Sequence, residues 1–133
     1  MARTNKAQNQ EDLGRVNAGL PIIHHSCGQI IDVLPDLVEL GIDVLHPIQN
    51  VLPKRELKQR YGGKMTFYGG IDTQHVMPFG TPEDVKSDVE NCIAVLGEGG
   101  GYVIGFAHTL TSETPIQNLY SVLEAIERYN QPW

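Results

Sequence analysis

Cysteine, basic residues and long apolar runs are all scarce in this chain. Its 133 residues include only two cysteines, which do not suggest a disulfide framework. Ten Lys and Arg against 16 Asp and Glu give a net charge of −6, which argues against nucleic acid and membrane surfaces as partners. No apolar run approaches the roughly 18 residues of a membrane span, and residues 1–19 lack the apolar core of a signal peptide. We therefore expect a cytoplasmic globular protein.

Strand and helix patterns alternate four times after a polar N-terminal stretch. Residues 1–18 are expected to form a polar leader with a short helical remnant, and residues 19–133 a single domain. Within the domain we expect strands over 21–25, 44–47, 65–69 and 102–107, and helices over 30–40, 54–61 and 82–96 and from Thr114 onwards. Thr81 and Pro82 form a helix start signal, and Thr114 followed by Gln117 predicts a capping box.

Four strands, each followed by a helix, predict a parallel sheet with right-handed crossovers. Two architectures fit this pattern: a small doubly wound sheet, or half of an eight-stranded β/α barrel. A whole barrel takes about 250 residues, and residues 19–133 are close to half of that length. In both architectures, functional side chains lie at the carboxyl ends of the strands.

Histidine and cysteine gather at these strand ends. His25 and Cys27 share one face of the first strand, and together an imidazole and a thiol form half of a soft-metal site. The same two residues could instead be packed without a metal. Side chains that follow the other strands are His46 and Gln49 after the second, Tyr68 and Asp72 after the third, and His108 after the fourth. Asp72 follows two glycines, so it could face the site or stabilise a turn. Cys92 lies on the apolar stripe of a helix and is expected in the core.

Several motifs resemble one known family. They are His25-Ser26-Cys27-Gly28, the segment 34–45, Gly69-Gly70-Ile71-Asp72-Thr73-Gln74, the segment 78–83, Gly100-Gly101-Tyr102 and the segment 108–115. In this order they are similar to the C-terminal half of the uroporphyrinogen decarboxylase superfamily, which also contains cobalamin-dependent methyltransferases. The resemblance runs from about Leu20 to Tyr129. It implies a (β/α)8 TIM barrel, of which this chain supplies four parallel βα units, strands five to eight.

The two branches of the family imply different chemistry. The methyltransferase branch has a zinc site built from His-X-Cys on strand five and a Cys near the end of strand eight. His25 and Cys27 match the first part, and the third position falls on His108. The resemblance thus implies zinc held by His25, Cys27 and His108, and methyl transfer to a thiol. The decarboxylases carry a His at the strand-eight position, so His108 also fits decarboxylation of uroporphyrinogen in porphyrin biosynthesis. Their functional Asp lies in the N-terminal half and has no counterpart here.

The remaining expectations concern the substrate and partners. Besides His108, Asp72 is a candidate catalytic residue, and His46, Gln49 and Tyr68 are candidates for substrate binding. The substrate is expected to be a tetrapyrrole or a thiol, with a corrinoid or corrinoid protein as a possible partner. Half a barrel leaves strand edges open and apolar residues such as Ile23 and Val103 uncovered. The chain is therefore expected to form a homo-oligomer, to need a partner half, or to be an inactive fragment.

Overall fold

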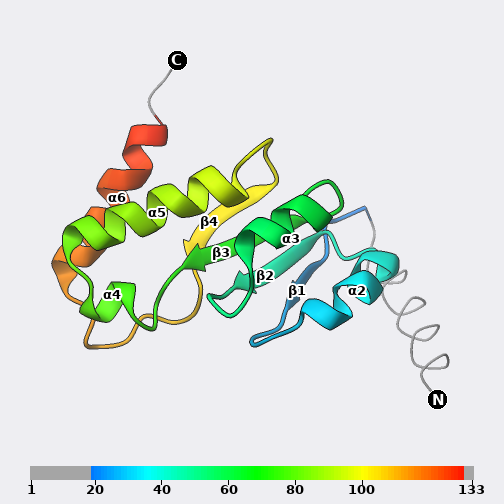
Figure 1. The fold of residues 1–133 in the computed structure, drawn as a ribbon, viewed down its shortest axis with the longest axis horizontal. Helices are drawn as coiled ribbons and strands as arrows, with labels where there is room; N and C mark the ends of the chain where they lie inside the picture. Colours follow the sequence, from blue (N-terminus) through cyan, green and yellow to red (C-terminus); the bar gives the residue numbers. More distant parts are fainter. Residues whose placement is uncertain (1–18, 131–133) are drawn as a thin grey trace.

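Four parallel strands form one sheet in sequential order. A computed structural model describes residues 19–130, with strands β1 (Ile23–His25), β2 (Val44–Ile48), β3 (Thr66–Ile71) and β4 (Tyr102–Phe106). The spatial order is β1-β2-β3-β4, and every neighbouring pair is parallel (Figure 1). This confirms the predicted βα units and fits a partial TIM barrel. The predicted leader, residues 1–18, lies outside the described residues.

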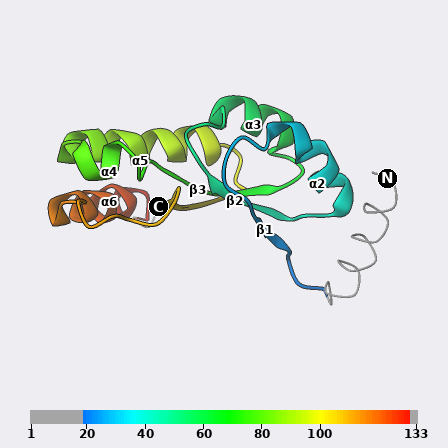
Figure 2. The same ribbon diagram turned by 90° about the horizontal axis from the view of Figure 1, so that it is seen from below.

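The helices are those expected, with two differences. They are η1 (Ile31–Val33), α2 (Leu34–Leu40), α3 (Lys54–Tyr61), α4 (Val76–Phe79), α5 (Pro82–Leu96) and α6 (Ile116–Tyr129). The stretch expected as one helix over 30–40 is split into η1 and α2, and α4 was not predicted. Helices α2, α3 and α5 lie along one side of the sheet, and α6 lies beside α5 (Figures 1 and 2). Among residues 19–130, no helix has the length and hydropathy needed to cross a membrane.

The two predicted helix starts have different outcomes. At α5, Thr81 Oγ1 accepts a hydrogen bond from the Asp84 N–H, and the Asp84 carboxylate accepts one from the Thr81 N–H. At α6 the predicted capping box is wrong. Pro115 is extended, with φ −64° and ψ 139°, and occupies the N-cap position itself, so Thr114 lies one residue outside the cap. The helix consequently begins at Ile116, and Thr114 Oγ1 is buried without a hydrogen-bond partner among the described residues.

The buried side of α6 is not a simple apolar stripe. Small and polar side chains face inward: Asn118, Ser121, Val122 and Ala125. Ile116, Tyr120 and Leu123 are exposed instead. The Asn118 side-chain amide donates to the carbonyls of Met77 and Gly80, both at 2.9 Å, and this ties α6 to α4. The inward face of α6 is therefore set by these hydrogen bonds as well as by apolar burial.

Apolar packing covers only the helix side of the sheet. Leu45 and Phe67 are fully buried there, in a cluster that α2 and α3 complete. On the opposite face, Ile23 is 58% exposed and Val103 is 47% exposed. This is the face that fills the interior of a closed barrel. The expected exposure of Ile23 and Val103 is thus confirmed.

Candidate functional site

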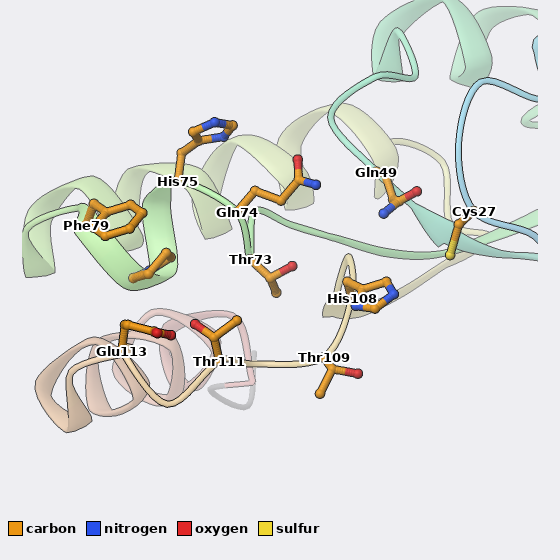
Figure 3. Close-up of a pocket in the computed structure, with 11 residues that line it drawn as sticks. Cys27, Gln49, Thr73, Gln74, His75, Phe79, His108, Thr109, Thr111 and Glu113 are labelled. Atoms are coloured by element: carbon orange, nitrogen blue, oxygen red, sulfur yellow. The ribbon is translucent and has the colours of Figure 1, made fainter.

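An open cleft of about 760 Å³ lies at the carboxyl ends of the strands (Figure 3). It brings together three residues singled out from the sequence, Cys27, Gln49 and His108. Neutral hydrogen-bonding side chains supply much of the remaining lining, including Thr73, Gln74, Thr109 and Thr111. The other predicted site residues, His25, His46, Tyr68 and Asp72, lie close by but are not among the lining residues.

The Cys27 loop is held in place by backbone hydrogen bonds to β2 and the segment after it. The Ser26 N–H donates to the His46 carbonyl at 2.9 Å, and the Gly28 N–H donates to Gln49 Oε1 at 2.8 Å. Gly28 has a φ of 87°, which a residue with a side chain rarely adopts. These contacts turn the chain at the end of β1 and leave the Cys27 thiol exposed to the cleft.

Cys27 and His25 lie at the spacing of two ligands of one metal ion. The distance from Cys27 Sγ to His25 Nε2 is 3.7 Å. With Zn–S near 2.3 Å and Zn–N near 2.0–2.1 Å at a tetrahedral angle, two zinc ligands lie about 3.6 Å apart. A thiolate and an imidazole are also donors that zinc prefers. The two residues therefore fit a zinc ion.

The third predicted ligand, His108, does not form one cluster with His25 and Cys27. Among residues 19–130, no group of three His, Cys, Asp or Glu side chains is arranged to hold a metal ion. His108 follows β4, is exposed, and lines the same cleft as Cys27. The expected convergence of all three residues on a common point is therefore not found among residues 19–130, since β1 and β4 lie at opposite edges of the sheet. His25 and Cys27 already lie at ligand spacing, and His108 lines the cleft onto which Cys27 opens.

His46 lies directly against His25. Their Nδ1 atoms are 2.9 Å apart, so one ring donates a hydrogen bond to the other. Burial, together with the neighbouring His25 ring, lowers the pKa of His46 and so favours its neutral form. On its other side the His46 ring packs on Tyr68, with ring centroids 4.4 Å apart. His46 and Tyr68 therefore contact a predicted metal ligand and each other.

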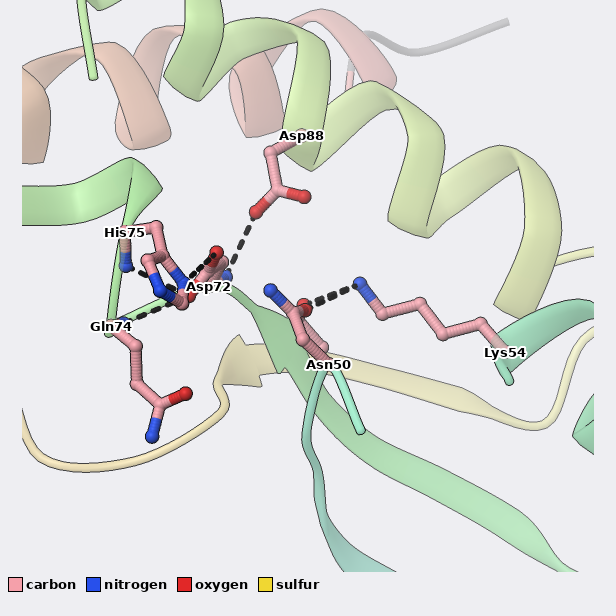
Figure 4. A network of polar contacts seen from close by, with 7 residues as sticks. Asn50, Lys54, Asp72, Gln74, His75 and Asp88 are labelled. Carbon is pink, nitrogen blue, oxygen red and sulfur yellow. Dashed lines mark hydrogen bonds and ion pairs between the residues drawn. The ribbon is translucent and has the colours of Figure 1, made fainter. Parts of the chain in front are cut away.

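Asp72 stabilises its own turn (Figure 4). Its Oδ1 accepts hydrogen bonds from the N–H groups of Gln74 and His75 at 2.8 and 3.1 Å, and its Oδ2 lies 3.5 Å from His75 Nδ1. Burial alone would raise the pKa of Asp72, but these bonds, the His75 charge and the Asn50 side chain together lower it. These bonds support the alternative that Asp72 stabilises a turn, because its carboxylate accepts hydrogen bonds from the backbone that follows β3.

A polar group behind β3 was missed from the sequence. The Lys54 ammonium donates to the Gly70 carbonyl at 2.9 Å and to Cys92 Sγ at 3.5 Å. Asp88 Oδ2 accepts a hydrogen bond from the Asp72 N–H at 2.9 Å (Figure 4). Burial raises the pKa of both Asp88 and Cys92. Cys92 is fully buried, as expected. In the sequence, the signal for this group was a charged residue on the side of each helix that faces the sheet: Lys54 on α3 and Asp88 on α5.

Comparison with known proteins decides the family. A family model described as uroporphyrinogen decarboxylase (URO-D) matches residues 4–129. The chain belongs to the URO-D family. It is 31% identical over 105 residues to a methylated-thiol–coenzyme M methyltransferase of Methanosarcina mazei, covering 79% of this chain and 27% of that protein. It is 29% identical over 91 residues to a uroporphyrinogen decarboxylase of Pseudoalteromonas atlantica, covering 68% of this chain and 23% of that protein.

A solved methyltransferase structure has the same fold. The structure of a methyltransferase from Methanosarcina mazei matches with a TM-score of 0.72 at 19% identity, over 95% of this chain and 36% of that chain. The URO-D chain thus spans about a quarter of its curated relatives and about a third of the solved methyltransferase. The relatives include both methyltransferases and decarboxylases, so the two branches implied by the motifs are both represented.

Proposed function

We propose that this URO-D chain is the thiol-binding part of a methyltransferase, in which His25 and Cys27 hold zinc and His108 completes the protein ligands. The observation that carries the proposal is the 3.7 Å separation of Cys27 Sγ and His25 Nε2 beside an open cleft. Zinc bound there would lower the pKa of a substrate thiol and hold the thiolate for attack on a methyl group.

The residues around the ligands have separate roles. Gln49 holds the Cys27 loop through the Gly28 N–H, so the thiol is aimed at the cleft before any metal binds. His108 lines the same cleft as Cys27, from the end of β4, and zinc binding would require its imidazole to turn towards Cys27. Thr73, Gln74 and Thr109 offer neutral donors and acceptors to the rest of the thiol substrate. Asp72 keeps the loop after β3 in shape and acts as a positioning residue.

Decarboxylation of a porphyrinogen is the second candidate. His108 favours it, because in the motif comparison the decarboxylases also have a His at this position. The charge of the cleft opposes it. Among the described residues that line the cleft there is no Lys or Arg, and Glu113 adds a negative charge. A substrate with several carboxylates needs cationic partners. The described part of the cleft therefore suits a neutral thiol better than a polyacidic tetrapyrrole.

The methyl donor and the partners follow from the same proposal. A corrinoid, free or carried by a protein, is the donor expected for the methyltransferase branch. The open inner face of the sheet, with Ile23 and Val103 uncovered, is closed by a second copy or by another half barrel. We place the protein in the cytoplasm, where Cys27 stays reduced.

Methyl transfer can be measured with simple reagents. The zinc-loaded chain is incubated with methylcobalamin and mercaptoethanol, and the methylated thiol is quantified by mass spectrometry. We expect product formation above the protein-free rate in the parent and not in Cys27→Ser, because the variant loses the soft donor. The variant His24→Ala, which removes a histidine on the opposite face of β1 from His25, serves as the control and should retain activity. Equal rates in the parent and Cys27→Ser would contradict the proposal.

A further inference from the structure

A row of ring side chains crosses the inner face of the sheet, one from each of three neighbouring strands. His25 of β1 pairs with His46 of β2 in the strand register, and the centroids of their rings are 4.9 Å apart. His46 in turn packs on Tyr68 of β3 with ring centroids at 4.4 Å. We call His25, His46 and Tyr68 the ring row. It ends at Cys27, 3.7 Å from His25 Nε2.

The ring row is seated on the backbone of β4. A Cβ atom added to Gly105 would lie 2.7 Å from Cε2 of Tyr68 and 3.3 Å from Cδ2. Glycine at this position therefore lets the Tyr68 ring lie against the strand. Because Tyr68 and His25 pack on opposite sides of His46, the His46 imidazole is confined between two rings. Its Nδ1 atom is held 2.9 Å from Nδ1 of His25.

A zinc-binding histidine needs a specific tautomer. If Nε2 of His25 binds the metal, the ring proton must sit on Nδ1, and that N–H needs an acceptor. A His46 ring that carries its proton on Nε2 presents a lone pair at Nδ1, 2.9 Å away. In the opposite arrangement His46 would donate, and His25 would present an N–H to Cys27 instead of a lone pair. The direction of this one hydrogen bond thus decides whether His25 can bind a metal.

We propose that His46 is a positioning residue that accepts the Nδ1–H of His25 and so keeps Nε2 of His25 available to zinc beside Cys27. The inference rests on the proposed zinc site and adds a group that does not itself bind the metal. Tyr68 and Gly105 support it by fixing the plane of the His46 ring. Metal affinity should therefore depend on an acceptor at this position, and not on an aromatic ring as such.

Two variants separate these roles. His46→Phe keeps a ring between His25 and Tyr68 but removes the acceptor, whereas His46→Asn places Oδ1 where Nδ1 of the histidine was. Zinc affinity is measured by competition with a chromophoric chelator, and the cobalt(II) spectrum reports whether the thiolate still binds. We expect His46→Phe to lower the affinity by about 10- to 100-fold, and His46→Asn to stay close to the parent. His24→Phe, on the opposite face of β1, is the control, and circular dichroism checks the fold of each variant.

The outcomes distinguish this inference from the zinc site itself. Parent-like zinc affinity in a folded His46→Phe variant overturns the role of His46 and leaves the zinc site intact. No zinc binding by the parent overturns both. A second measurement uses the parent alone. Nitrogen-15 NMR spectra report which ring nitrogen of each histidine carries the proton. We expect the His25 proton on Nδ1 in the zinc-loaded chain with His46 protonated on Nε2, and a proton on Nδ1 of His46 would overturn the inference.

Discussion

The Sγ atom of Cys27 and the Nε2 atom of His25 lie 3.7 Å apart at the end of β1. Alternation along an extended strand places residues two apart on one face, and the bonds of Ser26 and Gly28 hold the turn that follows. Two of the three proposed zinc ligands are thus arranged by local structure. The third, His108, comes from β4, at the other edge of the sheet.

Replacing Asp72 should affect stability more than chemistry. Asp72→Ala leaves the N–H groups of Gln74 and His75 without their acceptor, and we expect the free energy of unfolding to fall by about 1–3 kcal/mol. Urea unfolding at neutral pH measures this change. Asp72→Asn keeps an acceptor oxygen and should lose less. A variant Asp72→Ala that unfolds like the parent but has lost methyl transfer would support the catalytic role predicted from the sequence.

The same carboxylate predicts a pH dependence. The pKa of Asp72 is lowered from its ordinary value of 3.8, so the folded chain binds its proton less readily than the unfolded chain does. Its stabilisation is then complete above the unfolded pKa and is lost as the pH falls through the folded pKa. We expect the parent to lose more stability than Asp72→Asn over this acid range. Parallel stability curves for the two proteins would contradict the assignment.

Adding one methyl group at Gly105 should disturb the ring row. The new Cβ atom would lie 2.7 Å from Cε2 of Tyr68, so the ring must move, and we expect Gly105→Ala to cost about 1–3 kcal/mol of stability. A double-mutant cycle tests the cause. In a Tyr68→Ala background the added methyl group meets no ring, and its cost should shrink. A cost that is unchanged in that background would show that Tyr68 is not the reason.

The uncovered inner face of the sheet should drive self-association of the 133-residue chain. Val103 is 47% exposed there, and exposed apolar surface of this kind favours association. Val103→Lys should therefore reduce the mass measured by light scattering at high protein concentration. Val51→Lys is the matched control, because Val51 is 53% exposed but lies in the turn after β2. A parent that stays monomeric over a wide concentration range would contradict this prediction.

The order and direction of the strands could be predicted because each unit carries its own local signals. Apolar runs, helix starts such as Thr81-Pro82 and the lengths of the connections suffice for four parallel βα units. The start of α6 could not be predicted in the same way. Thr114-Pro115 repeats the Thr81-Pro82 pattern and Gln117 has capping-box spacing, yet Pro115 is extended and the first helical residue is Ile116.

The part of the site that could be predicted consists of residues that follow the strands. Cys27, Gln49 and His108 follow strands directly, so topology alone brings them to one cleft. Lys54 and Asp88 lie on helices, and their place behind β3 depends on how α3 and α5 pack against the sheet. The roles of His46 and Tyr68 depend on ring orientation, which alternation along a strand does not specify.

The zinc content of the purified chain tests the central claim most directly. The parent, Cys27→Ser, His108→Ala and the control His75→Ala are loaded with zinc, freed of excess metal and analysed by mass spectrometry. We predict about one zinc per chain in the parent and in His75→Ala, and much less in Cys27→Ser and His108→Ala. Little or no zinc in the parent, or the same content in all four proteins, would contradict the account.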